Sequence, residues 1–135
     1  FNLNYTYTST YDGAEQDDPK KNSDYYNSQM VRVPRHFLNL STKYFFPNKN
    51  LNLTLHTKAS SEARDYGNVN RPESRTYEDI RLHPYLINDL SLNYNLFDTY
   101  RVFFDIKNIF DKKYETALQY SQMDRSFNFG IKRVY

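Results

Sequence analysis

Few residues of this 135-residue chain are of types that could do chemistry, and their spacing is poor for it. The three histidines do not have the spacing of a zinc motif. They are His36, His56 and His83. The acidic stretch at residues 15–18 could offer oxygen ligands to calcium, but the spacing of an EF-hand loop is absent and a solvated loop is the simpler interpretation. We therefore predict no metal site and no cofactor.

Motifs for catalysis are also absent from the sequence. There is no Gly-x-Ser-x-Gly, no paired-histidine motif, and no phosphate-binding loop in a chain with only three glycines. The chain has no cysteine, which excludes a disulfide framework and thiolate chemistry. The formal net charge is +2 and basic residues form no run, so nucleic acid is not an expected partner. We predict that the protein is not an enzyme.

The composition combines a hydrophilic average with many aromatic residues. The mean hydropathy is -0.90, yet 18% of the residues are aromatic and 14 of them are tyrosines. A disordered chain would be poor in aromatic residues, so the polar residues must belong to ordered structure. Alternation of polar and apolar residues along β-strands reconciles the two observations.

Six stretches show this alternation, and none of the sequence has a convincing helical period. In the third stretch, for example, Leu51, Leu53 and Leu55 alternate with Asn52 and Thr54. The sequence thus predicts an all-β protein, an antiparallel up-and-down meander of about six strands. The predicted strands are residues 1–8, 35–46, 51–58, 86–96, 101–107 and 125–135.

The predicted connections alternate in length. Long polar loops occupy residues 12–30 and 62–84, a moderate one follows residue 107, and the turns at 47–50 and 97–100 are tight. In a meander, all the longer connections then lie at one end of the sheet, as in transmembrane β-barrels. A small soluble antiparallel sheet with one wet face remains the alternative. Because six strands leave two unpaired edges, the chain is expected to be a segment of a larger barrel.

Three sequence motifs resemble those of TonB-dependent outer-membrane receptors. The stretch "DIKNIFDKKYE" at 105–115 is similar to the family's Asn-Leu-Phe-Asp-Lys-x-Tyr signature. "VPRHF" at 33–37 resembles a strand opening of the family, and "RSFNFGIKRVY" at 125–135 resembles its terminal strand. The matching positions are Pro34, Arg35, His36, Asn108, Phe110, Asp111, Lys112, Tyr114, Phe127, Gly130 and Tyr135.

This resemblance implies that residues 1–135 are the C-terminal portion of a large barrel of about 22 strands. Such a receptor lies in the outer membrane of a Gram-negative bacterium, is filled by its own N-terminal plug domain, and takes up a scarce large solute of the ferric siderophore or cobalamin type. TonB supplies the energy through the N-terminus. The expected partners are therefore the plug, the remaining strands, TonB, outer-membrane lipids and the solute.

One face of the predicted strands is expected to point into the barrel lumen. Most residues there would bind the plug or water rather than solute. Two other classes stay open, a passive porin and an enzymatic outer-membrane barrel, and both lack a plug. The lumen-facing candidates are Asn52, Thr54, His56, Lys58, Asp105 and Lys107.

Overall fold

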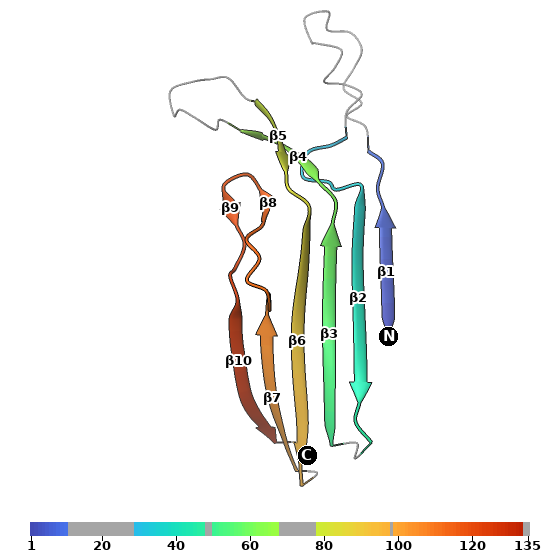
Figure 1. Ribbon diagram of the computed structural model, residues 1–135, viewed down its shortest axis with the longest axis vertical. Helices are drawn as coiled ribbons and strands as arrows, with labels where there is room; N and C mark the ends of the chain where they lie inside the picture. Colours follow the sequence, from blue (N-terminus) through green and yellow to red (C-terminus); the bar gives the residue numbers. More distant parts are fainter. Residues whose placement is uncertain (11–28, 48–49, 68–77, 98, 134–135) are drawn as a thin grey trace, which may run out of the picture.

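Six long strands form one antiparallel sheet in the computed structural model of the chain (Figure 1). The structure describes residues 1–10, 29–47, 50–67, 78–97 and 99–133. Neighbours in the sheet follow the order of the chain, in the up-and-down pattern that the alternation predicts. The strands are β1 (Asn2–Tyr7), β2 (His36–Phe45), β3 (Leu51–Ser60), β6 (Tyr85–Leu96), β7 (Tyr100–Lys107) and β10 (Ser126–Arg133).

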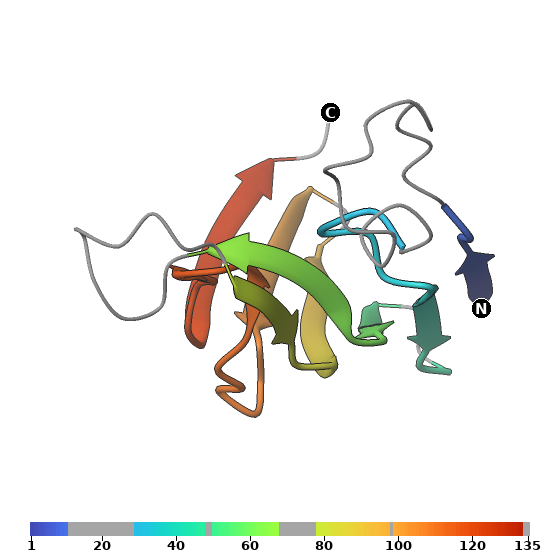
Figure 2. The same cartoon turned by 90° about the horizontal axis from the view of Figure 1, so that it is seen from above.

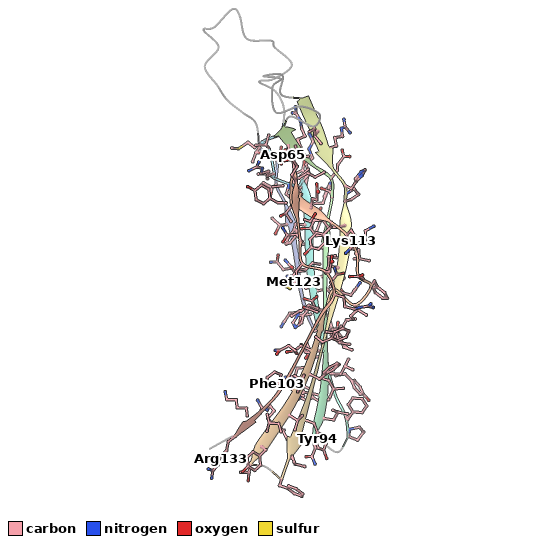
Figure 3. The ribbon with its side chains drawn as sticks, turned by 90° about the vertical axis from the view of Figure 1, so that its left-hand side faces the viewer. Asp65, Tyr94, Phe103, Lys113, Met123 and Arg133 are labelled. Carbon is pink, nitrogen blue, oxygen red and sulfur yellow. The ribbon has the colours of Figure 1, made fainter. Side chains whose placement is uncertain are left out.

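The sheet is a single curved layer. Seen along the strands, β1 and β10 stand at opposite edges of the row, and neither edge has a partner strand in the described part of the chain (Figure 2). Seen edge-on, side chains project from both faces and no second layer covers either of them (Figure 3). Among the described residues, the only buried large hydrophobic side chains are Leu82 and Ile87. The segment alone therefore has no apolar core.

The two tight turns lie together at one end of the sheet, as predicted (Figure 1). The first joins β2 to β3, and the N–H of Phe46 donates to the carbonyl of Leu51 at 3.1 Å. The second joins β6 to β7, where Phe97 has a φ of 53° and the N–H of Thr99 donates to the carbonyl of Leu96 at 3.3 Å. The longer connections are all at the opposite end.

Four short strands in these longer connections were not predicted. Residues 62–84 were expected to be a polar loop, but β4 (Ala63–Gly67) pairs with β5 (Glu78–Leu82). The connection after β7 likewise contains β8 (Glu115–Ala117) and β9 (Tyr120–Ser121). These strands are only two to five residues long, too short to give the periodic signal that revealed the six long ones. No helix within the described residues is long and apolar enough to cross a membrane.

Candidate functional site

The strand register gathers the six lumen-facing candidates on one face of the sheet. Thr54 is opposite Ser91, which is opposite Asp105. His56 is opposite Asp89 in the same way. Directly opposed residues of antiparallel strands point to the same side, so the strands share one polar face. We call it the polar face; its candidates are Asn52, Thr54, His56 and Lys58 on β3 and Asp105 and Lys107 on β7.

The polar face contains an ion pair that the sequence did not single out. Lys107 Nζ lies 3.3 Å from Asp89 Oδ2, and the residue Asp89 is only 8% exposed. The other carboxylate oxygen of Asp89 accepts the backbone N–H of Asn108 at 2.9 Å. One carboxylate thus joins β6 to the end of β7, where the strand passes into the next turn. A recess of about 350 Å³ opens beside this pair, across β1, β2 and β3.

The opposite face of the sheet is apolar and remains exposed. Phe104 stacks on Phe127 with ring centroids 6.3 Å apart. Phe127, one of the motif positions, therefore lies on the apolar face. Towards the ends of the strands the apolar residues give way to tyrosines, among them Tyr5 and Tyr7 at one end and Tyr44 and Tyr94 at the other. The exposed apolar side chains include Leu3, Leu86, Phe104, Phe127, Phe129 and Ile131.

The Pro-Arg-His motif forms the entry to β2. Pro34 and Arg35 precede the strand, and His36 is its first residue. The Tyr5 hydroxyl and His36 Nδ1 are 2.7 Å apart, and Tyr7 packs on the same imidazole with ring centroids separated by 5.3 Å. His36 therefore belongs to a cluster of rings at the loop end of β1 and β2.

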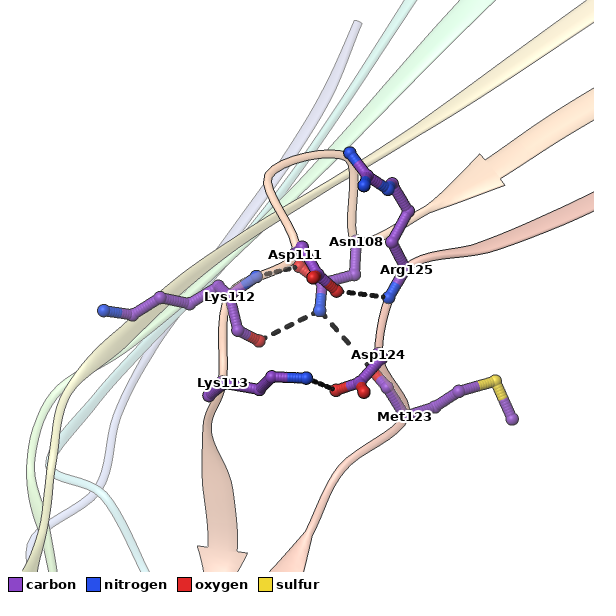
Figure 4. A network of polar contacts seen from close by, with 7 residues as sticks. All are labelled: Asn108, Asp111, Lys112, Lys113, Met123, Asp124 and Arg125. Atoms are coloured by element: carbon purple, nitrogen blue, oxygen red, sulfur yellow. Dashed lines mark hydrogen bonds and ion pairs between the residues drawn. The ribbon is translucent and has the colours of Figure 1, made fainter.

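The Asn-Ile-Phe-Asp-Lys motif is a turn organised around Asn108 (Figure 4). This residue is 4% exposed and has a φ of 50°. Its amide binds both backbone groups of Lys112: Oδ1 accepts the N–H at 2.9 Å, and Nδ2 donates to the carbonyl at 2.9 Å. A further contact runs from Nδ2 to the carbonyl of Met123 at 3.4 Å. Asparagine suits this position because it tolerates positive φ and offers both a donor and an acceptor.

The charged residues after Asn108 are exposed, as expected of a strand end, but they also fasten the turn to the segment before β10 (Figure 4). Asp111 Oδ1 accepts the N–H of Arg125 at 2.9 Å, and Lys113 forms an ion pair with Asp124. The hydrogen bond that the backbone N–H of Arg125 donates to Asp111 lowers the pKa of Asp111, and the hydrogen bond that Lys113 donates to the Asp124 carboxylate raises the pKa of Lys113. Phe110 is 73% exposed.

Tyr114, the last residue of this motif, packs on Tyr85 with ring centroids 4.6 Å apart. Tyr85 is opposite Ser60 in the register and belongs to the polar face. Partial burial raises the pKa of the Tyr114 phenol above its usual value. The tyrosine thus contacts the loop end of the polar face. The remaining motif position, Tyr135, lies outside the described residues.

Acidification is expected to loosen the contact between Asp111 and Arg125. The pKa of Asp111 is lower in the folded protein than its unfolded value of 3.8, so its stabilisation is complete above the unfolded pKa and is lost as the pH falls through the folded pKa. Amide exchange at Arg125, corrected for the intrinsic rate, should rise relative to neighbouring strands below pH ~4. Asp111→Asn, which keeps an acceptor but cannot titrate there, should show no such rise. An equal rise in both proteins would contradict the assignment.

Gly130 lies on the polar face opposite Phe103. A Cβ atom at this position would be 2.7 Å from Cζ of the Phe103 ring, so a larger residue must push the ring aside (ring labelled in Figure 3). We expect Gly130→Ala to lower the free energy of unfolding by about 1 kcal/mol. In a Phe103→Leu background most of that loss should disappear, since the ring is gone.

Thermal unfolding of the full-length protein that contains this segment measures the effect. Asn128→Ala is the control, because it lies on the same strand and face but is exposed, and it should change the stability by less than about 0.5 kcal/mol. An equal loss for Gly130→Ala with and without the Phe103 ring would show that the close approach is not the cause.

The residue that sequence reasoning missed most clearly is Asp65 in β4 (labelled in Figure 3). It is 1% exposed, and its two carboxylate oxygens lie 3.0 and 3.1 Å from Nε of Arg32. It also accepts the N–H of Leu118 at 2.6 Å. One buried carboxylate therefore ties together all three of the longer connections. Its sequence context is a polar loop with several other acidic residues, and nothing there distinguishes it.

No cluster of three or more His, Asp or Glu side chains within the described ranges could hold a metal ion. The acidic stretch at residues 15–18 lies outside those ranges. The site is therefore defined by its two unlike faces and by the fastened connections at one end. A one-layer antiparallel sheet with an exposed apolar face, a polar face and tyrosines near the strand ends is part of the wall of a transmembrane β-barrel.

Comparison with known protein families identifies the family to which the chain belongs. Residues 1–109 match the family model described as TonB dependent receptor-like, beta-barrel, and the chain belongs to this family. The resemblance noted in the sequence is thereby confirmed, as are the fold class and the prediction that the protein is not an enzyme. Membership also rules against the small soluble sheet. A search of curated proteins gave no match.

Solved structures agree on the fold. The pyoverdine outer-membrane receptor FpvA from Pseudomonas aeruginosa PAO1, bound to pyoverdine, is similar with a TM-score of 0.69 and 21% identity over 81% of this chain. The ferripyoverdine receptor of the same species, bound to ferripyoverdine, has a TM-score of 0.67 and 22% identity over 78% of this chain. A structure of the complex of FpvAI with pyocin S2 is similar with a TM-score of 0.68 and 22% identity over 81% of this chain. This chain spans 15 to 17% of the length of those receptors.

Proposed function

We propose that this chain is the C-terminal part of the barrel wall of an outer-membrane receptor that takes up a ferric siderophore, with energy supplied through TonB. The observation that supports this most is the pairing of an exposed apolar face with a polar face in a meander of this family. The exposed face would meet the lipids of a Gram-negative outer membrane. The polar face would meet the receptor's own plug domain.

The solute class is proposed from the similar structures. Two of them are receptors bound to pyoverdine or ferripyoverdine. A cobalamin-type solute, which the sequence resemblance also allows, has no such support. The same family membership favours a plugged receptor over a passive porin or a barrel enzyme.

Uptake by the full-length protein tests the function. Cells that lack their own siderophore receptors would express it and receive radiolabelled iron bound to pyoverdine-type siderophores, or labelled cobalamin. We expect iron to accumulate only in cells that have TonB. Equal accumulation with and without TonB would favour a passive porin, and uptake of cobalamin alone would overturn the siderophore assignment.

The orientation of the two faces has its own test. Thr54 and Leu55 are neighbours in β3, and they point to opposite faces. In the full-length protein, Thr54→Cys should react with a water-soluble maleimide once the plug is deleted, whereas Leu55→Cys should react only with a lipid-soluble reagent. The segment itself has no cysteine to interfere. Reaction of Leu55→Cys with the water-soluble reagent would contradict the proposed orientation.

A further inference from the structure

Two polar side chains, Thr57 on β3 and Asn88 on β6, lie within the apolar face of the sheet. They are direct cross-strand partners, so they leave the same side of the sheet. Each continues an apolar series at a spacing of two residues, because Thr57 follows Leu55 and Asn88 precedes Leu90. A threonine and an asparagine thus occupy positions that the alternation would give to apolar residues, and none of the functions considered above uses them.

The two side chains are bound to each other. The Thr57 hydroxyl donates to Oδ1 of Asn88 at 2.7 Å, and both residues are partly exposed. The backbone of Asn88 is fixed as well, because its carbonyl accepts the N–H of Ile109 at 2.9 Å. With its oxygen turned towards Thr57, the amide of Asn88 directs its nitrogen away from that residue.

This nitrogen of Asn88 carries two N–H groups, and neither has an acceptor within the described ranges of the chain. If the Thr57 hydroxyl accepted instead of donating, one N–H group would still be unpaired. An amide donor without an acceptor is costly in the hydrocarbon of a membrane, where water does not replace the missing partner. The Asn88 amide therefore requires an acceptor from outside this segment.

The pair lies near the loop end of both strands. Thr57 is three residues before Ser60, the last residue of β3, and Asn88 is three residues after Tyr85, the first of β6. At about 3.3 Å per residue, this separation is about 10 Å along the strand. Strands tilted by about 40° would place the pair about 8 Å below the strand ends. This depth is near the boundary between hydrocarbon and headgroups, where the ester groups of lipids lie.

The surroundings of the pair belong to the surface that would meet lipid. Leu86 lies on the same face two residues before Asn88 and is 54% exposed. In the other direction, the register continues from Thr57 through Leu40 to Leu3, which is 61% exposed. The pair is thus continuous with the exposed apolar face, and the acceptor that reaches it there would come from a lipid.

We propose that the Asn88 amide donates a hydrogen bond to the acyl-ester carbonyl of a membrane lipid. Thr57 is a positioning residue, which holds the amide so that its N–H groups face the lipid. A carbonyl oxygen is a good acceptor that carries no charge, which suits an uncharged donor at the edge of the hydrocarbon. The inference rests on the proposed orientation of the apolar face towards lipid, but not on the solute or on TonB.

Native mass spectrometry of the full-length protein tests this contact. The protein is released from nanodiscs that contain equal amounts of diester and diether phosphatidylcholine, which differ only in the ester carbonyls. Among the most strongly retained lipids, we expect about a fivefold preference for the diester, which corresponds to one neutral hydrogen bond. Asn88→Leu should bring this ratio close to one. Thr57→Val should also reduce it, because the bond that orients the amide is lost.

Asn39→Leu is the matched control, since Asn39 is opposite Lys58 on the polar face, and it should keep the wild-type ratio. Equal retention of the two lipids by the wild type, or an unchanged preference in Asn88→Leu, would overturn the proposal. A lipid-free dimer that Asn88→Leu dissociates would also overturn it, because a second copy would then supply the acceptor. Reaction of Leu55→Cys with the water-soluble maleimide would instead show that the orientation is wrong, which distinguishes the two failures.

Discussion

Asp65→Ala is expected to unfasten the longer connections and to lower the free energy of unfolding by about 2–3 kcal/mol. The substitution removes the acceptor of the Arg32 guanidinium and of the Leu118 N–H, which belong to two different connections. The carboxylate is 1% exposed, so water does not replace it easily. The expected loss in the free energy of unfolding is small for the breaking of a buried ion pair, because the Arg32 side chain is 54% exposed.

Limited proteolysis and thermal unfolding of the full-length protein measure this effect together. Cleavage should become faster in all three longer connections and stay unchanged at the two tight turns. Glu62→Ala is the matched control, since it removes another acidic residue paired with an arginine in the same region. That pair is exposed, and its loss should cost less than about 1 kcal/mol. Equal effects of the two substitutions would contradict a special role for Asp65.

Asn108→Ala is expected to have a similar effect, a loss of about 3 kcal/mol centred on the turn after β7. Two terms contribute. The backbone N–H and carbonyl of Lys112 lose their partners, which costs about 1 kcal/mol each or more, and alanine is strained at a φ of 50° by about 1 kcal/mol. Asn108→Gly loses the same two hydrogen bonds but avoids the backbone strain, because glycine accepts positive φ. It should therefore be less harmful by about 1 kcal/mol.

Hydrogen exchange followed by mass spectrometry localises the change to the turn. Lys112→Ala is the control: the Asn108 amide binds only the main chain of Lys112, so this variant should keep its protection. If Asn108→Gly and Asn108→Ala lost the same stability, backbone strain would not contribute. If Lys112→Ala exchanged as fast as Asn108→Ala, the side-chain amide would not be the organising group.

Strand position, face and the sorting of connections could all be predicted from the sequence. Alternation such as Leu53, Thr54, Leu55 is a local property with a period of two, and every residue carries part of the signal. The same pattern places Thr54 and Asp105 on one face before any register is known, and the register then brings both opposite Ser91. The motif around Asn108 was also found, although its role as a turn was not.

The contacts between the longer connections were decided by the tertiary structure alone. Asp65 contacts Arg32, 33 residues earlier, and Leu118, 53 residues later. The periodic pattern within one strand does not indicate contacts between residues that are so far apart in the sequence. The opposition of Arg64 and Arg81 likewise depends on the pairing of two strands that are only five residues long, too short for a recognisable period. The faces of a sheet follow from the geometry of each strand alone, whereas these contacts form because the long strands bring the ends of distant loops together at one end of the sheet.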